Sequence, residues 1–297
     1  MSNATDCRGM FLGASAFNQP IGDWDVSAVE DMSSMFAYAS QFNQFIGDWN
    51  VSSVLTMEFM FLDASLFNQP LDRWGVASVT NMQGMFYEAS SFNQTIGTWD
   101  VSATTTMAQM FFNALSFNQP INQWDVSGVT DMNRMFSGLA ATPAFNQPLG
   151  DWVVSNVTNM ALMFAGQSSF NQPLNNWDVS AVTDMSAMFS QAGAFDQPIG
   201  DWDVSSVLYM NGMFYSASSF NQALDDWDTS RTTTMKDMFY RALSFNQEIG
   251  SWNVSRVTDM SRMLSALPIF NHDLGRWDVA SVITMEKMFE NSIFNVS

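Results

Sequence analysis

Cysteine and histidine are almost absent from this sequence. Cys7 is the only cysteine and His272 the only histidine among 297 residues. A single cysteine excludes an intrachain disulfide bond. Without a second histidine, the usual catalytic triads and His/Cys zinc sites cannot be assembled.

Basic residues are also scarce, with 10 Lys and Arg against 29 Asp and Glu and a net charge of −19. Binding to a phosphate backbone needs a Lys/Arg cluster, and the sequence has none, so nucleic acid is excluded as a partner. Residues 1–226 hold 21 acids and three bases, a net charge of −18, whereas residues 227–297 hold eight acids and seven bases, a net charge of −1. The acidity is therefore concentrated in the first three quarters of the chain.

Long apolar runs are missing as well. No segment approaches the roughly 18 apolar residues of a membrane-spanning helix, and the opening residues lack the basic and apolar regions of a signal peptide. We expect no direct membrane insertion, and we expect any export signal or anchor to lie outside this chain. The 47% hydrophobic and 14% aromatic content nevertheless predicts a folded chain with a sizeable core.

What the sequence has in abundance is a repeat. Eleven tryptophans recur every 25 residues, except for one interval of 28 between Trp124 and Trp152 that places a three-residue loop insertion near residues 139–144. Stacked copies can bury the Trp, Val, Met and Phe of each repeat against its neighbours. The sequence predicts one continuous solenoid over residues 7–297 that is a fragment of a longer array, preceded by a tail or cloning remnant at residues 1–6.

Two periodicities inside the repeat predict its secondary structure. Met32, Met35 and Phe36 begin an i, i+3, i+4, i+7 apolar pattern, which is typical of a short α or 3₁₀ helix. Residues 23–27 alternate polar and apolar, which is typical of a half-buried strand. The predicted fold class is an α/β repeat: a β/α solenoid of about eleven 25-residue coils, with a parallel sheet on one face and short α or 3₁₀ helices on the other.

Two further positions refine this picture. Threonines such as Thr80 stand just before the apolar pattern, where the N-cap of a helix is expected. Only Gly, Asn or Asp precedes each predicted strand, as at Gly22, which predicts a left-handed turn residue there.

Asn follows Phe in nearly every repeat, with Asp196 as the one substitute. An amide inside a loop can satisfy backbone groups of its own and the next coil, so we interpret these residues as a structural ladder rather than a ligand site. His272 stands where other repeats have Gln, and we interpret it as a substitute within this ladder. The ladder comprises Asn18, Asn43, Asn68, Asn93, Asn118, Asn146, Asn171, Asn221, Asn246 and Asn271.

Acidic residues at the outward positions of the predicted strands form two columns. They are Asp23, Asp25, Asp48, Asp100, Asp125, Asp178, Asp201, Asp203, Asp226 and Asp228. Three interpretations stay open: a solvated face, a partner-binding face, and Ca²⁺ sites that bridge neighbouring coils. No catalytic residue, metal site or cofactor is predicted beyond that Ca²⁺ alternative.

Residues 177–205, which contain WDVSAVTDMSAMF and then AFDQPIGDWDVS, resemble the repeats of BspA-like leucine-rich-repeat surface proteins, in a 25-residue form also found in mycoplasma lipoproteins. The resemblance extends from about Cys7 to the C-terminus. It implies a leucine-rich-repeat-like solenoid at the cell surface or outside the cell that mediates adhesion or protein contacts without catalysis.

These observations lead to one functional hypothesis and two alternatives. The hypothesis is a non-enzymatic cell-surface or secreted module that binds a protein or glycan through an acidic concave sheet face. The first alternative is a self-assembling element that stacks end to end. A more remote one is a glycan-active enzyme, since glycosidases use paired carboxylates.

Overall fold

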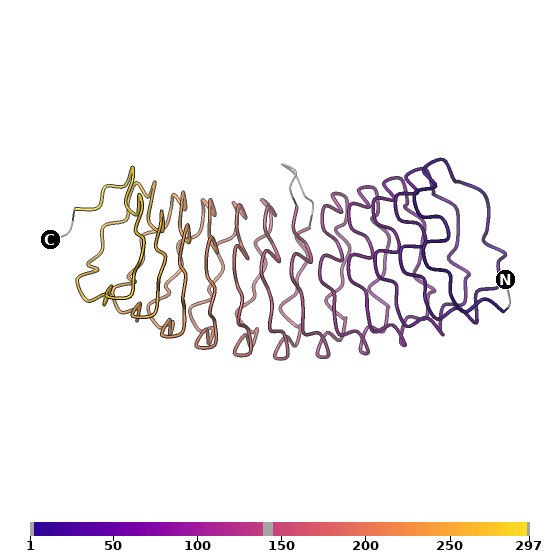
Figure 1. Ribbon diagram of the computed structural model, residues 1–297, viewed down its shortest axis with the longest axis horizontal. Helices are drawn as coiled ribbons and strands as arrows, with labels where there is room; N and C mark the ends of the chain where they lie inside the picture. Colours follow the sequence, from indigo (N-terminus) through magenta and orange to yellow (C-terminus); the bar gives the residue numbers. More distant parts are fainter. Residues whose placement is uncertain (1–2, 139–144, 296–297) are drawn as a thin grey trace. The chain divides into compact units, whose positions relative to one another are not determined.

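A computed structural model describes residues 3–138 and 145–295. The insertion predicted near residues 139–144 lies outside the described residues. The chain divides into two compact units, Met1–Val153 and Val154–Ser297. Within each unit, successive segments of the chain wind as coils laid side by side (Figure 1).

Regular secondary structure is almost missing from the described residues. Residues 3–138 and 145–295 contain no helix, and hence none that could cross a membrane, and their β-structure consists of single-residue parallel bridges. In each unit five bridges join residues 25 positions apart. They run through Asp6, Asp31, Thr56, Asn81, Thr106 and Asp131 in the first unit, and through Asn159, Asp184, Tyr209, Thr234, Asp259 and Thr284 in the second.

The predicted α/β solenoid, with a parallel sheet on one face and helices on the other, is therefore wrong. Where helices were expected, the backbone forms overlapping turns, such as the one closed by Met35 N donating to Met32 O at 3.2 Å. The N–H groups between these turns donate to the next coil, as from Met32 to Thr56 O at 3.1 Å and from Phe36 to Met60 O at 2.9 Å. An α-helix needs each N–H to reach the carbonyl four residues earlier, so these contacts preclude one.

The predicted strands are turns as well. Trp49 N donates to Ile46 O at 3.1 Å and Val54 N to Val51 O at 3.0 Å, and no described residue of 48–52 donates a backbone N–H to another coil. The alternation is still a burial pattern, because Trp49 and Val51 are 3% and 1% exposed while the residues between and beside them face solvent. The alternation of apolar and polar residues therefore indicates which side chains are buried, and it does not indicate a pleated strand.

The left-handed residues also lie elsewhere than predicted. They occur inside the overlapping turns, with φ of 54° at Ser34 and 60° at Tyr38, and Gly22 is not among them. A Cβ at Gly22 would lie 2.8 Å from Phe45 O, so the next coil passes too close for a side chain there in this conformation. The expected N-cap at Thr80 is absent too, because its hydroxyl donates to Leu55 O of the preceding coil at 3.2 Å.

The core of each unit lies between coils, where equivalent aromatic rings stack. Phe61 lies 5.6 Å from Phe86, and Trp74 lies 6.4 Å from Trp99, with nearly parallel rings in both pairs. The indole of Trp99 also donates from Nε1 to Leu71 O in the preceding coil at 2.9 Å. Each repeat therefore packs on and hydrogen-bonds to the repeats on either side, as the solenoid model requires.

Candidate partner-binding surface

The Asn ladder links neighbouring coils along one side of each unit. Asn18 Oδ1 accepts hydrogen bonds from Asn43 N and from Gln44 Nε2, both at 3.0 Å. The backbone contact recurs with the Oδ1 atoms of Asn43, Asn68, Asn93, Asn118, Asn171, Asn221 and Asn271, and Asn146 and Asn246 donate their N–H groups in it. These amides therefore connect the coils to one another.

Two substitutions in the ladder keep its contacts. Asp196 Oδ1 accepts from Asn221 N at 2.9 Å and from Gln222 Nε2 at 2.8 Å. His272 takes the place of Gln, with Nε2 3.0 Å from Asn246 O and Nδ1 2.8 Å from Glu248 Oε1. The one histidine therefore lies in the same contact network as the glutamines of other coils.

The first acidic column lies in turns, where each carboxylate accepts hydrogen bonds from the serine two residues later. Asp25 Oδ1 accepts from Ser27 N at 3.1 Å and from Ser27 Oγ at 2.6 Å. Equivalent backbone contacts occur at Asp100, Asp125, Asp178, Asp203 and Asp228. These aspartates therefore help to close a turn in each coil.

Hydrogen bonds from the serine lower the pKa of five of these carboxyls. The serine hydroxyl is the largest cause and the serine N–H the second at Asp25, Asp100, Asp125, Asp178 and Asp228. A hydrogen bond donated to a carboxylate favours its charged form. The serine contacts therefore favour the charged form of these five carboxyls.

The second acidic column is exposed and less regular. It holds Asp23, Asp48, Asp201 and Asp226. Asp48 Oδ1 pairs with Arg73 Nη1 at 2.7 Å, and Asp226 borders an open cavity of about 460 Å³ together with Glu248 and Arg276. Across the described part of the chain, no three His, Cys, Asp or Glu side chains gather as metal ligands would.

Neither acidic column lies on a concave sheet, because the segments that carry them are turns. The expectation of an acidic sheet face is wrong for that reason. The carboxylates still occupy equivalent places in successive coils of each unit, so they give the surface a repeated negative charge.

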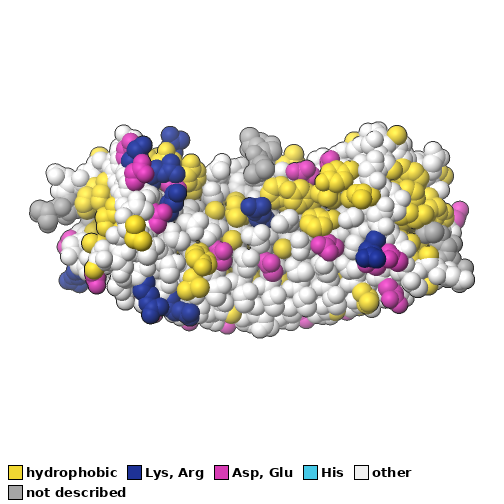
Figure 2. Space-filling model, viewed as in Figure 1, with side chains coloured by type: hydrophobic (Ala, Val, Ile, Leu, Met, Phe, Trp, Pro, Cys, Tyr) yellow, Lys and Arg dark blue, Asp and Glu magenta, His cyan; other side chains and the backbone are white. Residues whose placement is uncertain are grey.

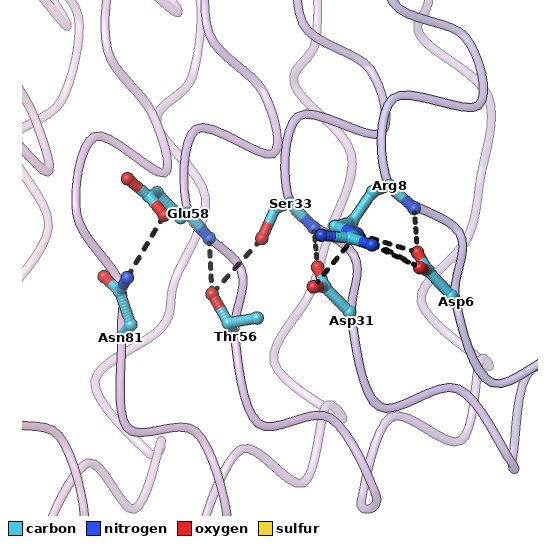
Figure 3. A network of polar contacts seen from close by, with 7 residues as sticks. All are labelled: Asp6, Arg8, Asp31, Ser33, Thr56, Glu58 and Asn81. Carbon is cyan, nitrogen blue, oxygen red and sulfur yellow. Dashed lines mark hydrogen bonds and ion pairs between the residues drawn. The ribbon is translucent and has the colours of Figure 1, made fainter.

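A further polar row follows the bridge residues of the first unit (Figure 3). Asp31 Oδ1 accepts from Ser33 N at 2.8 Å, and Asn81 Nδ2 donates to Glu58 Oε2 at 3.3 Å. Arg8 pairs with Asp6 at 2.8 Å and with Asp31 at 3.4 Å, and its guanidinium lowers the pKa of Asp6. Side chains from different coils therefore meet regularly along this row.

An aromatic row on the first unit was missed by the sequence analysis. We define it as Tyr38, Phe59, Tyr87 and Phe112. Tyr38 is 49% exposed, Phe59 and Tyr87 meet edge to face at 6.3 Å, and Tyr87 stacks on Phe112 at 4.5 Å. Figure 2 shows hydrophobic side chains gathered over the first unit with acidic ones among them. The sequence did carry a signal for this row, because its aromatic residues stand at repeat positions where the residue type differs from one repeat to the next.

The second unit carries a mixed aromatic and basic cluster. Tyr215 stacks on Tyr240 at 5.0 Å, and the guanidinium groups of Arg241 and Arg262 each lie 5.2 Å from the Tyr240 ring centre. Arg262 also pairs with Asp237 at 2.7 Å, and this carboxylate raises the pKa of the guanidinium. These arginines are therefore engaged with neighbouring side chains of the same unit.

Comparisons with known proteins place the repeat in a family. No curated protein matches the sequence. A solved leucine-rich-repeat protein of Leptospira interrogans is 6% identical over 88% of this chain and 76% of its own, with a TM-score of 0.19, and a likeness this weak carries no argument. The family model described as Mycoplasma protein of unknown function, DUF285, matches residues 1–95, 69–160, 138–233 and 197–296. Because these matches together span residues 1–296, the chain belongs to the DUF285 family of repeat proteins.

Proposed function

We propose that this chain is a non-enzymatic binding module that recognises a protein partner through the aromatic row of its first unit. The supporting observation is that Tyr38, Phe59 and Tyr87 reach solvent at positions where other coils carry residues that are not aromatic. The equivalents of Tyr38 and Phe59 in a neighbouring coil are Asp63 and Ser34, and the coil that contains Tyr38 holds Ala37 at the position of Tyr87. Exposed tyrosines and phenylalanines that the fold does not need are typical of protein interfaces.

Acidic side chains flank the aromatic row and set the charge of the partner. Glu58 and Glu88 lie next to Phe59 and Tyr87 in the sequence, Asp63 occupies the position of Tyr38 in the following coil, and residues 1–226 carry a net charge of −18. A surface of this kind attracts a basic partner and repels an acidic one. The acidic side chains of the two columns add to this attraction.

The same carboxylates support a role in binding rather than in catalysis. A glycosidase needs one carboxylic acid whose pKa is raised, so that it can donate a proton near neutral pH. The pKa of Asp25, Asp100 and Asp178 is instead lowered by their serine partners. These acids suit electrostatic attraction better than proton transfer.

We further infer a BspA-like protein at the cell surface or outside the cell, where adhesion is the natural use of such a module. The support is the resemblance of residues 177–205 to repeats of that kind. Glycan binding is the main competing outcome, because sugars also stack on tyrosine rings.

Selection from a displayed random-peptide library on the immobilised chain tests the proposal. Peptides that combine Lys or Arg with apolar residues should be enriched, and the variant Tyr87→Ala should bind them about tenfold more weakly or worse. The matched control is Leu66→Ala, which truncates a side chain that is 46% exposed and lies outside the row. A thermal melt of both variants confirms folding.

Two results would count against the proposal. Equal loss of peptide binding in Tyr87→Ala and Leu66→Ala would remove the aromatic row from the interface. Binding to a glycan array that depends on Tyr87, with no peptide enriched, would replace the protein partner with a carbohydrate.

A further inference from the structure

An open cavity in the second unit is lined by polar side chains from three successive coils. Its volume is about 440 Å³. The lining includes Ser190 and Gln191 from one coil, Asn211 and Tyr215 from the next, and Lys236 from the third. Sites for small ligands have volumes of roughly 300–1,000 Å³ and a few well-placed polar groups. The cavity therefore has the size and the kind of lining that a small polar ligand needs.

The equivalent place in the first unit is filled by an aromatic side chain. There a left-handed glycine, Gly84, precedes Tyr87 by three residues. Phe59 of the preceding coil lies so close that a Cβ at Gly84 would overlap its ring. The same ring meets Tyr87 edge to face at 6.3 Å. Phe59 therefore occupies the space that is open in the second unit.

The second unit has the same glycine and tyrosine but lacks the filling side chain. Gly212 is left-handed and precedes Tyr215 by three residues, and Ala187 stands at the position of Phe59. A Cβ at Gly212 would lie 3.8 Å from Ala187 Cβ, which is an ordinary contact. Ala187 and Phe59 have nearly the same φ, 53° and 51°. The cavity therefore results from a smaller side chain on an equivalent backbone.

Several polar groups in the cavity have no partner within the described part of the chain. Ser190 is 9% exposed, and its hydroxyl forms no hydrogen bond with a residue of 3–138 or 145–295. Asn211 Oδ1 accepts from Ser186 Oγ at 2.9 Å, whereas its Nδ2 donates to no described residue. Buried polar groups in proteins are usually hydrogen-bonded. These groups are therefore available to a ligand that both donates and accepts hydrogen bonds.

One positive charge borders the cavity without a counter-charge. Lys236 forms no ion pair with any residue that the structure describes. Its neighbour Asp237 also lines the cavity, but Arg262 pairs with it through Nε at 2.7 Å and donates Nη2 to its second oxygen at 2.9 Å. Because the charge of Asp237 is compensated in this way, Lys236 makes the cavity attractive to an anionic group.

Tyr215 forms an aromatic wall of the cavity and is supported from the following coil. Its ring stacks on Tyr240 at 5.0 Å. The guanidinium groups of Arg241 and Arg262 each lie 5.2 Å from the centre of the Tyr240 ring. Figure 2 shows several basic side chains gathered over the second unit. A tyrosine held in this way offers an apolar ring for packing and a hydroxyl for hydrogen bonding.

We propose that this cavity binds a sugar that carries a single carboxylate, such as a uronic acid unit of a glycan. Lys236 pairs with the carboxylate, Ser190 and Asn211 hydrogen-bond to the sugar hydroxyls, and Tyr215 packs against the sugar ring. Side-chain amides suit this role because they both donate and accept hydrogen bonds, as sugar hydroxyls do. The net charge of −19 on the chain repels a polyanion, so the ligand has an isolated negative charge.

Titrations of the chain with sodium glucuronate, followed by saturation-transfer NMR, test the proposal. The wild type should bind glucuronate about tenfold more tightly than glucose, which lacks the carboxylate, and than propionate, which lacks the sugar ring. Lys236→Met should reduce the affinity for glucuronate to that for glucose. The matched control is Lys287→Met, which removes the one other lysine of the sequence at a site outside the cavity and should bind as the wild type does.

A second variant, Ala187→Phe, should close the cavity without unfolding the chain. Phe59 has nearly the same φ in the first unit, so a phenylalanine fits this backbone. Its ring should lie over Gly212 as that of Phe59 lies over Gly84. Binding of glucuronate should then be lost, while the melting temperature stays close to that of the wild type.

Three results would overturn the proposal. Absence of glucuronate binding to the wild type would remove the sugar as the ligand. Binding that survives in Ala187→Phe would place the sugar outside the cavity. Equal affinity for glucuronate and propionate, lost in Lys236→Met, would show a carboxylate site that suits an acidic peptide. The aromatic row is tested separately, because Tyr87→Ala should lose peptide binding and keep glucuronate binding.

Discussion

Replacement of Asn93 by alanine should destabilise the chain through the loss of two contacts between coils. Asn93 Oδ1 accepts from Asn118 N and from Gln119 Nε2, both at 3.0 Å. Each such hydrogen bond contributes about 0.5–1.5 kcal/mol, and the loss of both leaves the Asn118 N–H without its acceptor. The side chain is half-buried, so water compensates in part, and we expect a loss of about 1–2 kcal/mol in the free energy of unfolding.

The informative comparison is Asn93→Asp. Asp196 already fills the equivalent position and accepts from Asn221 N at 2.9 Å and from Gln222 Nε2 at 2.8 Å. A carboxylate at position 93 should therefore keep both contacts and cost well under half of the loss seen with alanine. Urea unfolding followed by tryptophan fluorescence at neutral pH measures both variants against the wild type.

The control for this comparison is Gln119→Ala, which removes one of the two hydrogen bonds and leaves the other. Its cost should lie between those of Asn93→Asp and Asn93→Ala. If aspartate proves as damaging as alanine at position 93, the Oδ1 acceptor is not what stabilises the coil contact. The ladder would then need another explanation, such as a ligand that requires the amide group.

Two further predictions concern a buried hydroxyl and the acidic turns. Thr104→Val should cost no more than about 1 kcal/mol in the same urea assay, because it removes the hydrogen bond that the buried Thr104 Oγ1 donates to Val79 O at 2.9 Å but places Val where equivalent coils already carry it. Ser180→Ala should remove the main cause of the lowered pKa of Asp178. Because that pKa is lowered on folding, its stabilisation is present above the unfolded value of 3.8 and is lost as pH falls through the folded one. The melting temperatures of wild type and Ser180→Ala should thus differ by a constant amount near neutral pH and converge in acid.

Burial was largely predictable from the spacing of residues. Trp99, Met85 and Phe86 recur every 25 positions, and all three are 3% exposed or less. A side chain that recurs at a fixed interval has to meet its equivalents in neighbouring coils once the copies stack. The sequence therefore predicted which residues pack together even though it predicted the wrong backbone for them.

Backbone conformation was not predictable, because the deciding hydrogen bonds are made between coils. Met32, Met35 and Phe36 fit a helical apolar pattern, and overlapping turns bury the same three side chains. A local pattern does not distinguish these two conformations. The choice is made by contacts such as Met32 N to Thr56 O, which join residues 24 positions apart.

The restricted residue at Gly22 shows the same limit. Gly, Asn and Asp share a tolerance for positive φ, so their recurrence predicted a left-handed turn. The structure places the left-handed residues at Ser34 and Tyr38 instead, and the close approach of Phe45 O leaves no room for a Cβ at Gly22 as its backbone lies. Composition alone does not separate a constraint on φ from a constraint on volume.

The candidate surface is found by setting aside the residues that stabilise the coils and considering the exposed residues that remain. Asp25 recurs because its carboxylate accepts from Ser27 and helps to close a turn, so the recurrence of acids is explained without a partner. Tyr38 and Tyr87 have no such explanation, since coils with Asp63 or Ala37 at the equivalent positions fold in the same way. In a repeat protein, the packing of one coil on the next determines the residue type at positions that every coil shares. Specific recognition must then come from exposed positions at which one coil differs from the next.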